Sequence, residues 1–137
     1  MGSLIDTSWL IAVERILAGS TDLQLTFPTS PVVSAVTIAE LRMGIELADE
    51  SHRHDRQRFV DAVLENVAVI PFGLGEAAAY ARIAAVLRRA GQRIGERDLL
   101  IAATAVANGH SVITLNASEF ERVPGLTVLS PPLPPRA

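Results

Sequence analysis

The chain has 137 residues, of which 49% are hydrophobic and 20% charged; this composition fits one globular domain and excludes a disordered or collagen-like chain. It contains no cysteine and no lysine, since all 12 basic residues are arginines, so zinc ribbons, thiol nucleophiles, lysine Schiff bases and lysine-containing phosphate loops are excluded. A net charge of −3 argues against coating of nucleic acid by bulk positive charge, although single arginines can still contact phosphate.

The first predicted strand, residues 3–5, is a short apolar run that ends at Asp6. A helix is expected over residues 9–18, with Ser8 as its cap and Gly19 just past its end. Asp6 therefore follows the carboxyl end of a strand, where the functional crevice of an open parallel sheet lies. The alternative is turn chemistry, in which the Asp6 side chain only accepts hydrogen bonds from nearby backbone amides.

A second strand is expected at residues 31–34 and a helix over residues 37–48. Thr37 and Glu40 match a capping box, which by itself explains a glutamate at this spacing. Glu40 nevertheless borders the buried face of the helix, and Gly44, one turn later, costs about 1 kcal/mol relative to alanine. That cost indicates the close approach of another backbone or of a ligand.

The middle of the chain predicts an arginine-rich helix over residues 53–65, a strand at residues 67–70 and a helix over residues 76–90. His52 and His54 are two positions apart, so on a helix they point to different sides and do not chelate one ion. We interpret this charged run as a solvated helix face.

The helix expected over residues 96–108 is apolar around its whole circumference after the first turn, which predicts that it is buried. Asp98 lies in that first turn, where the helix dipole alone favours an acid, but a buried carboxylate would also need a cation or a proton. A strand at residues 111–115 precedes Asn116 and Glu119, for which a turn and ordinary surface charge are the alternatives to a site.

A last strand at residues 126–129 precedes a proline-rich, extended tail at residues 131–137, so the domain is expected to span residues 1–130. The strands are nearly continuous apolar runs, typical of strands covered on both faces. Because strands and helices alternate, the sequence predicts an α/β fold with a central, mainly parallel sheet.

Polar side chains that follow strands or begin helices should meet at one edge of this sheet: Asp6, Glu40, Asp98, Asn116 and Glu119. Two carboxylates about 4 Å apart repel by about 4 kcal/mol at an effective dielectric constant near 20. With no cysteine or histidine expected beside them, the fitting counter-ion is a hard cation, Mg²⁺ or Mn²⁺. Such a set of acids supports metal-assisted hydrolysis of phosphodiesters.

Four segments in chain order resemble the acidic motifs of the PIN-domain ribonucleases and, among these, the VapC-type toxins of bacterial toxin–antitoxin pairs. They are residues 4–8 (LIDTS), residues 34–41 (SAVTIAEL) with Gly44, residues 94–103 (IGERDLLIAA) and residues 114–126, which hold TLN and FERVPGL. Each segment is a weak pattern, but four in order over nearly the entire chain are a strong signal. The resemblance implies a single three-layer α/β/α PIN-like domain.

The resemblance further implies a Mg²⁺-dependent endoribonuclease, with Mn²⁺ as a substitute, in which Asp6, Glu40 and Asp98 are the catalytic, metal-binding acids. Thr7 or Ser8 would support the first of these. In the fourth motif, Asn116 stands where some members have aspartate, so Glu119 is the nearest acid for that position. Metal-activated water would cleave the RNA and leave a 5′-phosphate and a 3′-hydroxyl.

The expected partners are an RNA substrate, a VapB-like antitoxin, and a second copy of the chain, giving a homodimer and a toxin–antitoxin hetero-oligomer. Arg97, beside Asp98, is the best candidate for gripping RNA phosphate, with Arg93 and Arg42 behind it. The start of the chain lacks a basic leader, and the longest apolar stretch, residues 99–107, is shorter than the roughly 20 residues that cross a bilayer. We therefore expect a cytoplasmic protein without a membrane partner.

The main alternative is a non-catalytic PIN-fold module that binds RNA or a partner, because Asn116 brings no charge to the fourth motif. Receiver domains place acids similarly but use a lysine, which this chain lacks. Haloacid-type phosphatases need a second aspartate where Ser8 stands.

Overall fold

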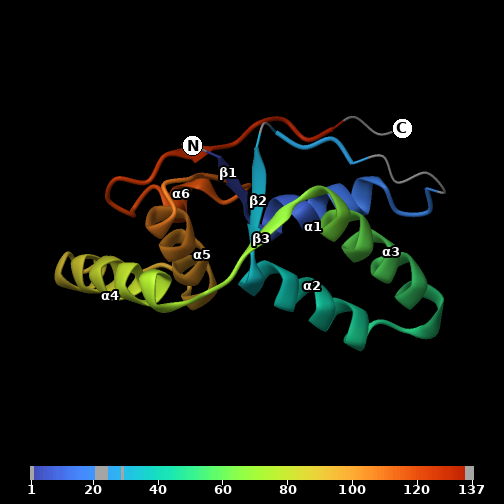
Figure 1. The fold of residues 1–137 in the computed structure, drawn as a ribbon, viewed down its shortest axis with the longest axis horizontal. Helices are drawn as coiled ribbons and strands as arrows, with labels where there is room; N and C mark the ends of the chain where they lie inside the picture. Colours follow the sequence, from blue (N-terminus) through green and yellow to red (C-terminus); the bar gives the residue numbers. More distant parts are fainter. Residues whose placement is uncertain (1, 21–24, 29, 135–137) are drawn as a thin grey trace.

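A five-stranded, all-parallel sheet in the order β3-β2-β1-β4-β5 organises the chain, as a computed structural model of residues 2–20, 25–28 and 30–134 shows (Figure 1). The strands are β1 (Ser3–Ile5), β2 (Pro31–Ser34), β3 (Ala68–Ile70), β4 (Ser111–Ile113) and β5 (Val128–Leu129). All five predicted strands are present, and the predicted α/β class with a parallel sheet is confirmed.

Helices cover both faces of the sheet (Figure 1). They are α1 (Thr7–Ile16), α2 (Ala35–Leu47), α3 (Glu50–Asn66), α4 (Leu74–Arg89), α5 (Glu96–Ala107) and α6 (Ala117–Phe120). Leu4 belongs to a core shared with α4, α5 and α6, whereas Ile5 belongs to a second core shared with α1, α2 and α3. Because successive strand side chains point to opposite faces, these two residues mark the two sides of a three-layer α/β/α arrangement.

The central strands are buried on both faces, but the edge strands are not. All three residues of β4 are buried, as are Leu4 and Ile5 of β1. Val69 of β3 and Leu129 of β5 remain 41% and 43% exposed. The prediction that every apolar strand is covered on both faces is therefore wrong at the two edges of the sheet, where the helical layers end.

Two predicted helix caps are wrong, because α1 and α2 each begin two residues earlier than expected. Asp6, not Ser8, occupies the cap position of α1. Ser34, not Thr37, caps α2, and its hydroxyl accepts a hydrogen bond from the Val36 amide at 3.0 Å. Thr37 thus lies inside the first turn of α2, so the proposed capping box with Glu40 does not form.

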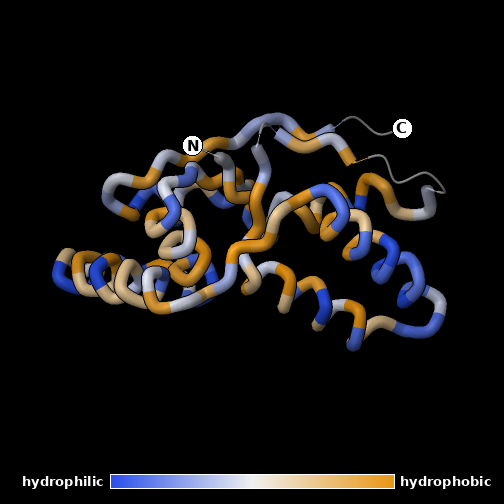
Figure 2. The backbone as a smooth tube through the Cα atoms, viewed as in Figure 1, coloured by the Kyte–Doolittle hydropathy of each residue, from blue (hydrophilic) through white to orange (hydrophobic). Residues whose placement is uncertain are grey.

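The other helices match their predicted ranges to within three residues, and the short α6 was not predicted. Helix α5 is buried as expected, with residues 101–105 inaccessible to solvent. The first half of α3 is hydrophilic (Figure 2), which agrees with a solvated face at the histidine and arginine run.

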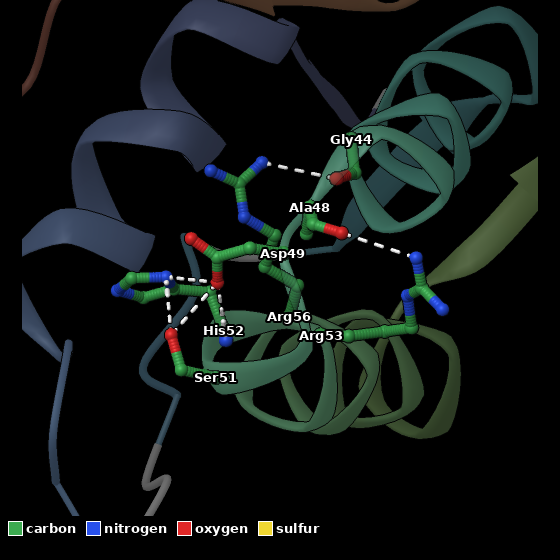
Figure 3. A network of polar contacts seen from close by, with 7 residues as sticks. All are labelled: Gly44, Ala48, Asp49, Ser51, His52, Arg53 and Arg56. Atoms are coloured by element: carbon green, nitrogen blue, oxygen red, sulfur yellow. Dashed lines mark hydrogen bonds and ion pairs between the residues drawn. The ribbon is translucent and has the colours of Figure 1, made fainter.

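A contact between α2 and α3 explains why residue 44 of α2 is a glycine (Figure 3). The guanidinium of Arg56 donates to the Gly44 carbonyl at 3.2 Å, and an added Cβ at Gly44 would lie 3.1 Å from that guanidinium. The close neighbour is thus a side chain of α3, not another backbone or a ligand. Asp49 caps α3 by accepting from the His52 amide at 3.1 Å, and Arg53 donates to the Ala48 carbonyl (Figure 3).

Beyond β5, residues 131–134 form neither helix nor strand, and residues 135–137 of the predicted tail lie outside the described residues. Leu133 packs against the second core, so this segment contacts the domain. The division of the chain at residue 130 remains a prediction. Within the described ranges, the helices are too short or too polar to cross a membrane.

Candidate functional site

The carboxyl ends of the three central strands, β2, β1 and β4, lie side by side because all strands are parallel. Asp6 directly follows β1, and Thr114 directly follows β4. Helices α1 and α2 begin at this same edge, since each starts where its strand ends. The fold therefore gathers the first turns of two helices and the ends of three strands at one place.

Asp6 is a buried carboxylate held by hydroxyl groups. It is 2% exposed, and its Oδ2 accepts hydrogen bonds from Ser8 Oγ at 2.7 Å and Thr114 Oγ1 at 2.8 Å. Its side chain makes no capping hydrogen bond to α1, so the turn-chemistry interpretation does not describe it. Two hydroxyl donors offset part of the cost of burying this charge and orient the carboxylate.

Glu40 projects from α2 toward α1 and α5. Its Oε1 accepts from the Thr7 hydroxyl at 2.8 Å, and its Oε2 lies 2.6 Å from a guanidinium nitrogen of Arg97. The Glu40 side chain is only 14% exposed, whereas that of Arg97 is 62% exposed. The Thr7 hydroxyl also lies 2.9 Å from the Thr37 hydroxyl, so the Thr37 side chain helps to fix Thr7. The ion pair between Arg97 and Glu40 connects the start of α5 to α2.

Asp98, Glu119 and Asn116 form a third group at the start of α5. Burial, a hydrogen bond with Glu119, and the nearby charges of Asp6 and Glu119 raise the pKa of Asp98 to about 7, while Arg97 opposes the rise. The hydrogen bond from Asp98 and the Gly95 amide lower the pKa of Glu119. These opposite shifts favour a proton on Asp98 over one on Glu119 as pH falls below about 7. Asn116 Nδ2 donates a hydrogen bond to Asp98 Oδ2 at 3.3 Å.

This raised pKa gives the metal-free protein a defined pH dependence. Between the unfolded pKa of 3.8 and the folded value of about 7, folded Asp98 keeps a proton that the unfolded chain has lost. We expect the melting temperature in EDTA to fall as pH rises from 5 to 8, and to fall less steeply in Asp98→Asn. The lowered pKa of Glu119 acts in the opposite direction but below this window, as pH falls under the ordinary glutamate value of 4.5. Equal slopes in the two proteins would show that Asp98 does not carry this effect.

The structure thus brings all eight predicted site residues to one edge, in three linked groups: Asp6 with Ser8; Thr7, Glu40 and Arg97; and Asp98, Asn116 and Glu119. Within the described ranges, no three histidine or acid side chains already stand close enough to hold one metal ion. The donors are nevertheless all hard oxygens, and the charge of Asp6 disfavours ionisation of Asp98. A divalent cation fits this set because it would offset that repulsion in place of a proton on Asp98.

Two further arginines that were predicted to bind RNA phosphate do not join the contacts of this site within the described residues. Arg42 is exposed on α2, and Arg93 lies in the segment before α5, where its carbonyl accepts a hydrogen bond from Arg122. Neither guanidinium pairs with an acid of the site in the part of the chain that the structure describes.

Two residues of the site had no role in the prediction. Thr114 bonds Asp6 and also accepts from the Asn116 amide at 2.8 Å, and the Gly95 amide donates to Glu119 at 3.3 Å. Thr114 had a detectable signal, since it is a polar residue directly after the apolar Val112 and Ile113. The Gly95 amide is a backbone group and leaves no such mark in the sequence.

Comparison with known proteins adds to this geometry. The pattern of the PIN domain matches residues 3–126. The chain is 37% identical to Ribonuclease VapC1 of Rickettsia felis over 131 residues, which cover 95% of this chain and 96% of that protein. It is also 37% identical to Ribonuclease VapC of Rickettsia bellii over 134 residues, 97% and 98% of the two chains. Among solved structures, VapBC-5 from Mycobacterium tuberculosis, of the VapBC family of toxin-antitoxin systems, has a TM-score of 0.72 at 27% identity over 93% of this chain and 95% of that chain.

Proposed function

Because this chain belongs to the PIN-domain family and, within it, to the VapC ribonucleases, we propose that it is a Mg²⁺-dependent endoribonuclease, the toxin of a toxin–antitoxin pair. The predicted resemblance to that family is confirmed. The observation that carries the proposal is the set of acids at the carboxyl edge of the sheet of this chain. Its relatives of nearly equal length are named ribonucleases.

We assign the divalent cation to Asp6, Glu40 and Asp98, with Glu119 as a further acid. When bound, it would supply a water of lowered pKa and positive charge beside the phosphate. Mg²⁺ is the expected ion, and Mn²⁺ is expected to replace it because both prefer carboxylate oxygens. Members of this family are typically metal-dependent.

The residues around these acids have separate tasks in the proposed reaction. Ser8 and Thr114 fix the Asp6 carboxylate, and Thr7 fixes Glu40, so the acids hold their orientation without substrate. Arg97 extends from the edge of the site with its side chain 62% exposed, in a position to bind an RNA phosphate. The acids of the site repel the negatively charged phosphate of the substrate, and the guanidinium of Arg97 would offset part of that repulsion.

We assign the fourth motif to two residues of this chain, where the family resemblance implies a single aspartate in some members. Glu119 lies against Asp98 and supplies the negative charge, while Asn116 donates a hydrogen bond to Asp98 and supplies none. This division supports a catalytic site over the non-catalytic binding module, because Glu119 replaces the charge that Asn116 lacks.

Cleavage assays with and without chelator test the proposal. We expect the purified protein to cleave structured RNA with Mg²⁺ or Mn²⁺, to stop in EDTA, and to resume when excess metal is restored. Products should carry a 5′-phosphate and a 3′-hydroxyl, which end-specific ligation would detect. Binding of RNA without cleavage under all these conditions would favour the non-catalytic module, and cleavage that persists in EDTA would contradict the metal mechanism.

We further propose that the chain pairs with a VapB-like antitoxin and forms a homodimer, as a cytoplasmic protein that acts on RNA there. Support for the pairing with an antitoxin comes from the structural similarity to VapBC-5, which belongs to a family of toxin-antitoxin systems.

A further inference from the structure

Arg97 and Glu40 form an ion pair across the mouth of the candidate site. Their closest nitrogen and oxygen atoms are 2.6 Å apart, and the pair joins the first turn of α5 to α2. The two partners differ in burial, since Glu40 is 14% exposed and Arg97 is 62% exposed. A largely buried acid is thus neutralised by a side chain that reaches it from the solvent.

Both carboxylate oxygens of Glu40 are already occupied by side chains of this protein. Thr7 donates to Oε1, and Arg97 binds Oε2. A divalent cation that binds Glu40 therefore competes with the guanidinium of Arg97 for the negative charge of this carboxylate. The long, exposed side chain of Arg97 can move without disturbing either core, because neither hydrophobic core includes it.

We propose that Arg97 is a built-in counter-ion that occupies Glu40 when no divalent cation is bound and is released to the RNA phosphate when one is. This inference rests on the proposed function and assigns Arg97 a role in metal loading as well as in substrate binding. It follows that metal and RNA each strengthen the binding of the other. A bound metal frees Arg97 for the RNA phosphate, and RNA that binds Arg97 frees Glu40 for the metal. By linkage, the factor by which RNA tightens metal binding equals the factor by which metal tightens RNA binding.

The competing interpretation is a static strut between α2 and α5. A strut would lower the melting temperature when broken but would leave the metal affinity of Glu40 unchanged or weakened by loss of order. A counter-ion competes with the metal, so its removal strengthens metal binding. The two interpretations therefore predict opposite directions for one measurable constant.

Calorimetric titration of Mn²⁺ into Arg97→Gln decides between them. We expect Arg97→Gln to bind Mn²⁺ about fivefold more tightly than the unaltered protein. This factor corresponds to the free energy that a partly exposed ion pair typically contributes. Arg82→Gln is the matched control, since it removes the same charge from an exposed position on α4 and should leave the affinity unchanged. Arg97→Lys keeps a cation beside Glu40 and should retain most of the competition. Equal or weaker Mn²⁺ binding by Arg97→Gln would overturn the proposal.

A second titration, with a 2′-O-methyl RNA oligonucleotide present and its integrity checked on a gel afterwards, tests the coupling. The oligonucleotide should tighten Mn²⁺ binding to the unaltered protein by a larger factor than to Arg97→Gln, because only the former has a guanidinium to exchange. Equal factors would overturn the coupling between the ligands. If the unaltered protein takes up no Mn²⁺ with or without RNA, the proposed function itself fails; if it binds Mn²⁺ and Arg97→Gln binds it no more tightly, only the role of Arg97 fails.

Discussion

Asp98→Asn is expected to reduce RNA cleavage by about a thousandfold or more while the protein remains folded. The amide keeps the shape of the side chain but brings no negative charge to the divalent cation. Because burial and neighbouring acids raise the pKa of Asp98 to about 7, its ionised form is costly in the metal-free fold. The variant should therefore melt at or above the temperature of the unaltered protein at pH 8 in EDTA.

Asp61→Asn provides the matched control for this experiment. Asp61 is exposed on α3, and its Oδ1 accepts a hydrogen bond from Gln57 at 2.9 Å, which an asparagine oxygen can still accept. Initial cleavage rates and melting curves should match those of the unaltered protein. Full-rate cleavage by Asp98→Asn would remove Asp98 from the site, whereas a cleavage defect accompanied by unfolding would show a structural role.

The largest effect on stability is expected from Phe120→Ala, which should lower the free energy of unfolding by about 3–5 kcal/mol. Phe120 is the last residue of α6, is 0% exposed, and belongs to the core shared with α4 and α5. A four-residue helix has little stability of its own, so α6 depends on this buried ring. Urea unfolding followed by circular dichroism measures the loss, which is large against a typical total of about 5–15 kcal/mol.

A nearby exposed residue supplies the comparison. Leu115 precedes α6 but is 50% exposed, so Leu115→Ala should change the free energy of unfolding by less than about 0.5 kcal/mol. Phe120→Leu keeps most of the buried volume and should lose less stability than Phe120→Ala. A small loss in Phe120→Ala would mean that α6 is held by its backbone and polar contacts instead.

Hydrophobic patterns in the sequence predicted a helix or strand well where nearly all of its residues are apolar. The helix at residues 96–108 was recognisable because it is apolar all round, and α5 is buried as expected. The strand at residues 67–70 was predicted, but its expected burial on both faces was wrong. An edge strand and a central strand can have the same apolar sequence. The predicted cap of α2 was wrong because two nearby residues can both cap a helix. Thr37 has the right spacing to Glu40, but in the structure the hydroxyl of Ser34 makes the capping hydrogen bond.

The acids of the candidate site were predicted one by one, each with an ordinary alternative. Asp6 could have been a turn residue and Glu40 a capping residue, and in the structure neither side chain makes those contacts. The sequence could not reveal this, because Asp6 and its partner Thr114 are 108 positions apart.

The sequence by itself determined the order of strands and helices and the placing of acids at strand ends, because hydrophobic periodicity and short spacings are properties of neighbouring residues. Only the tertiary structure decided what each acid faces: Ser8 and Thr114 for Asp6, Glu119 for Asp98 and Arg97 for Glu40. Those pairings depend on distances across a partly buried site, where a charge must be neutralised, protonated or hydrogen-bonded by whichever group the fold brings near.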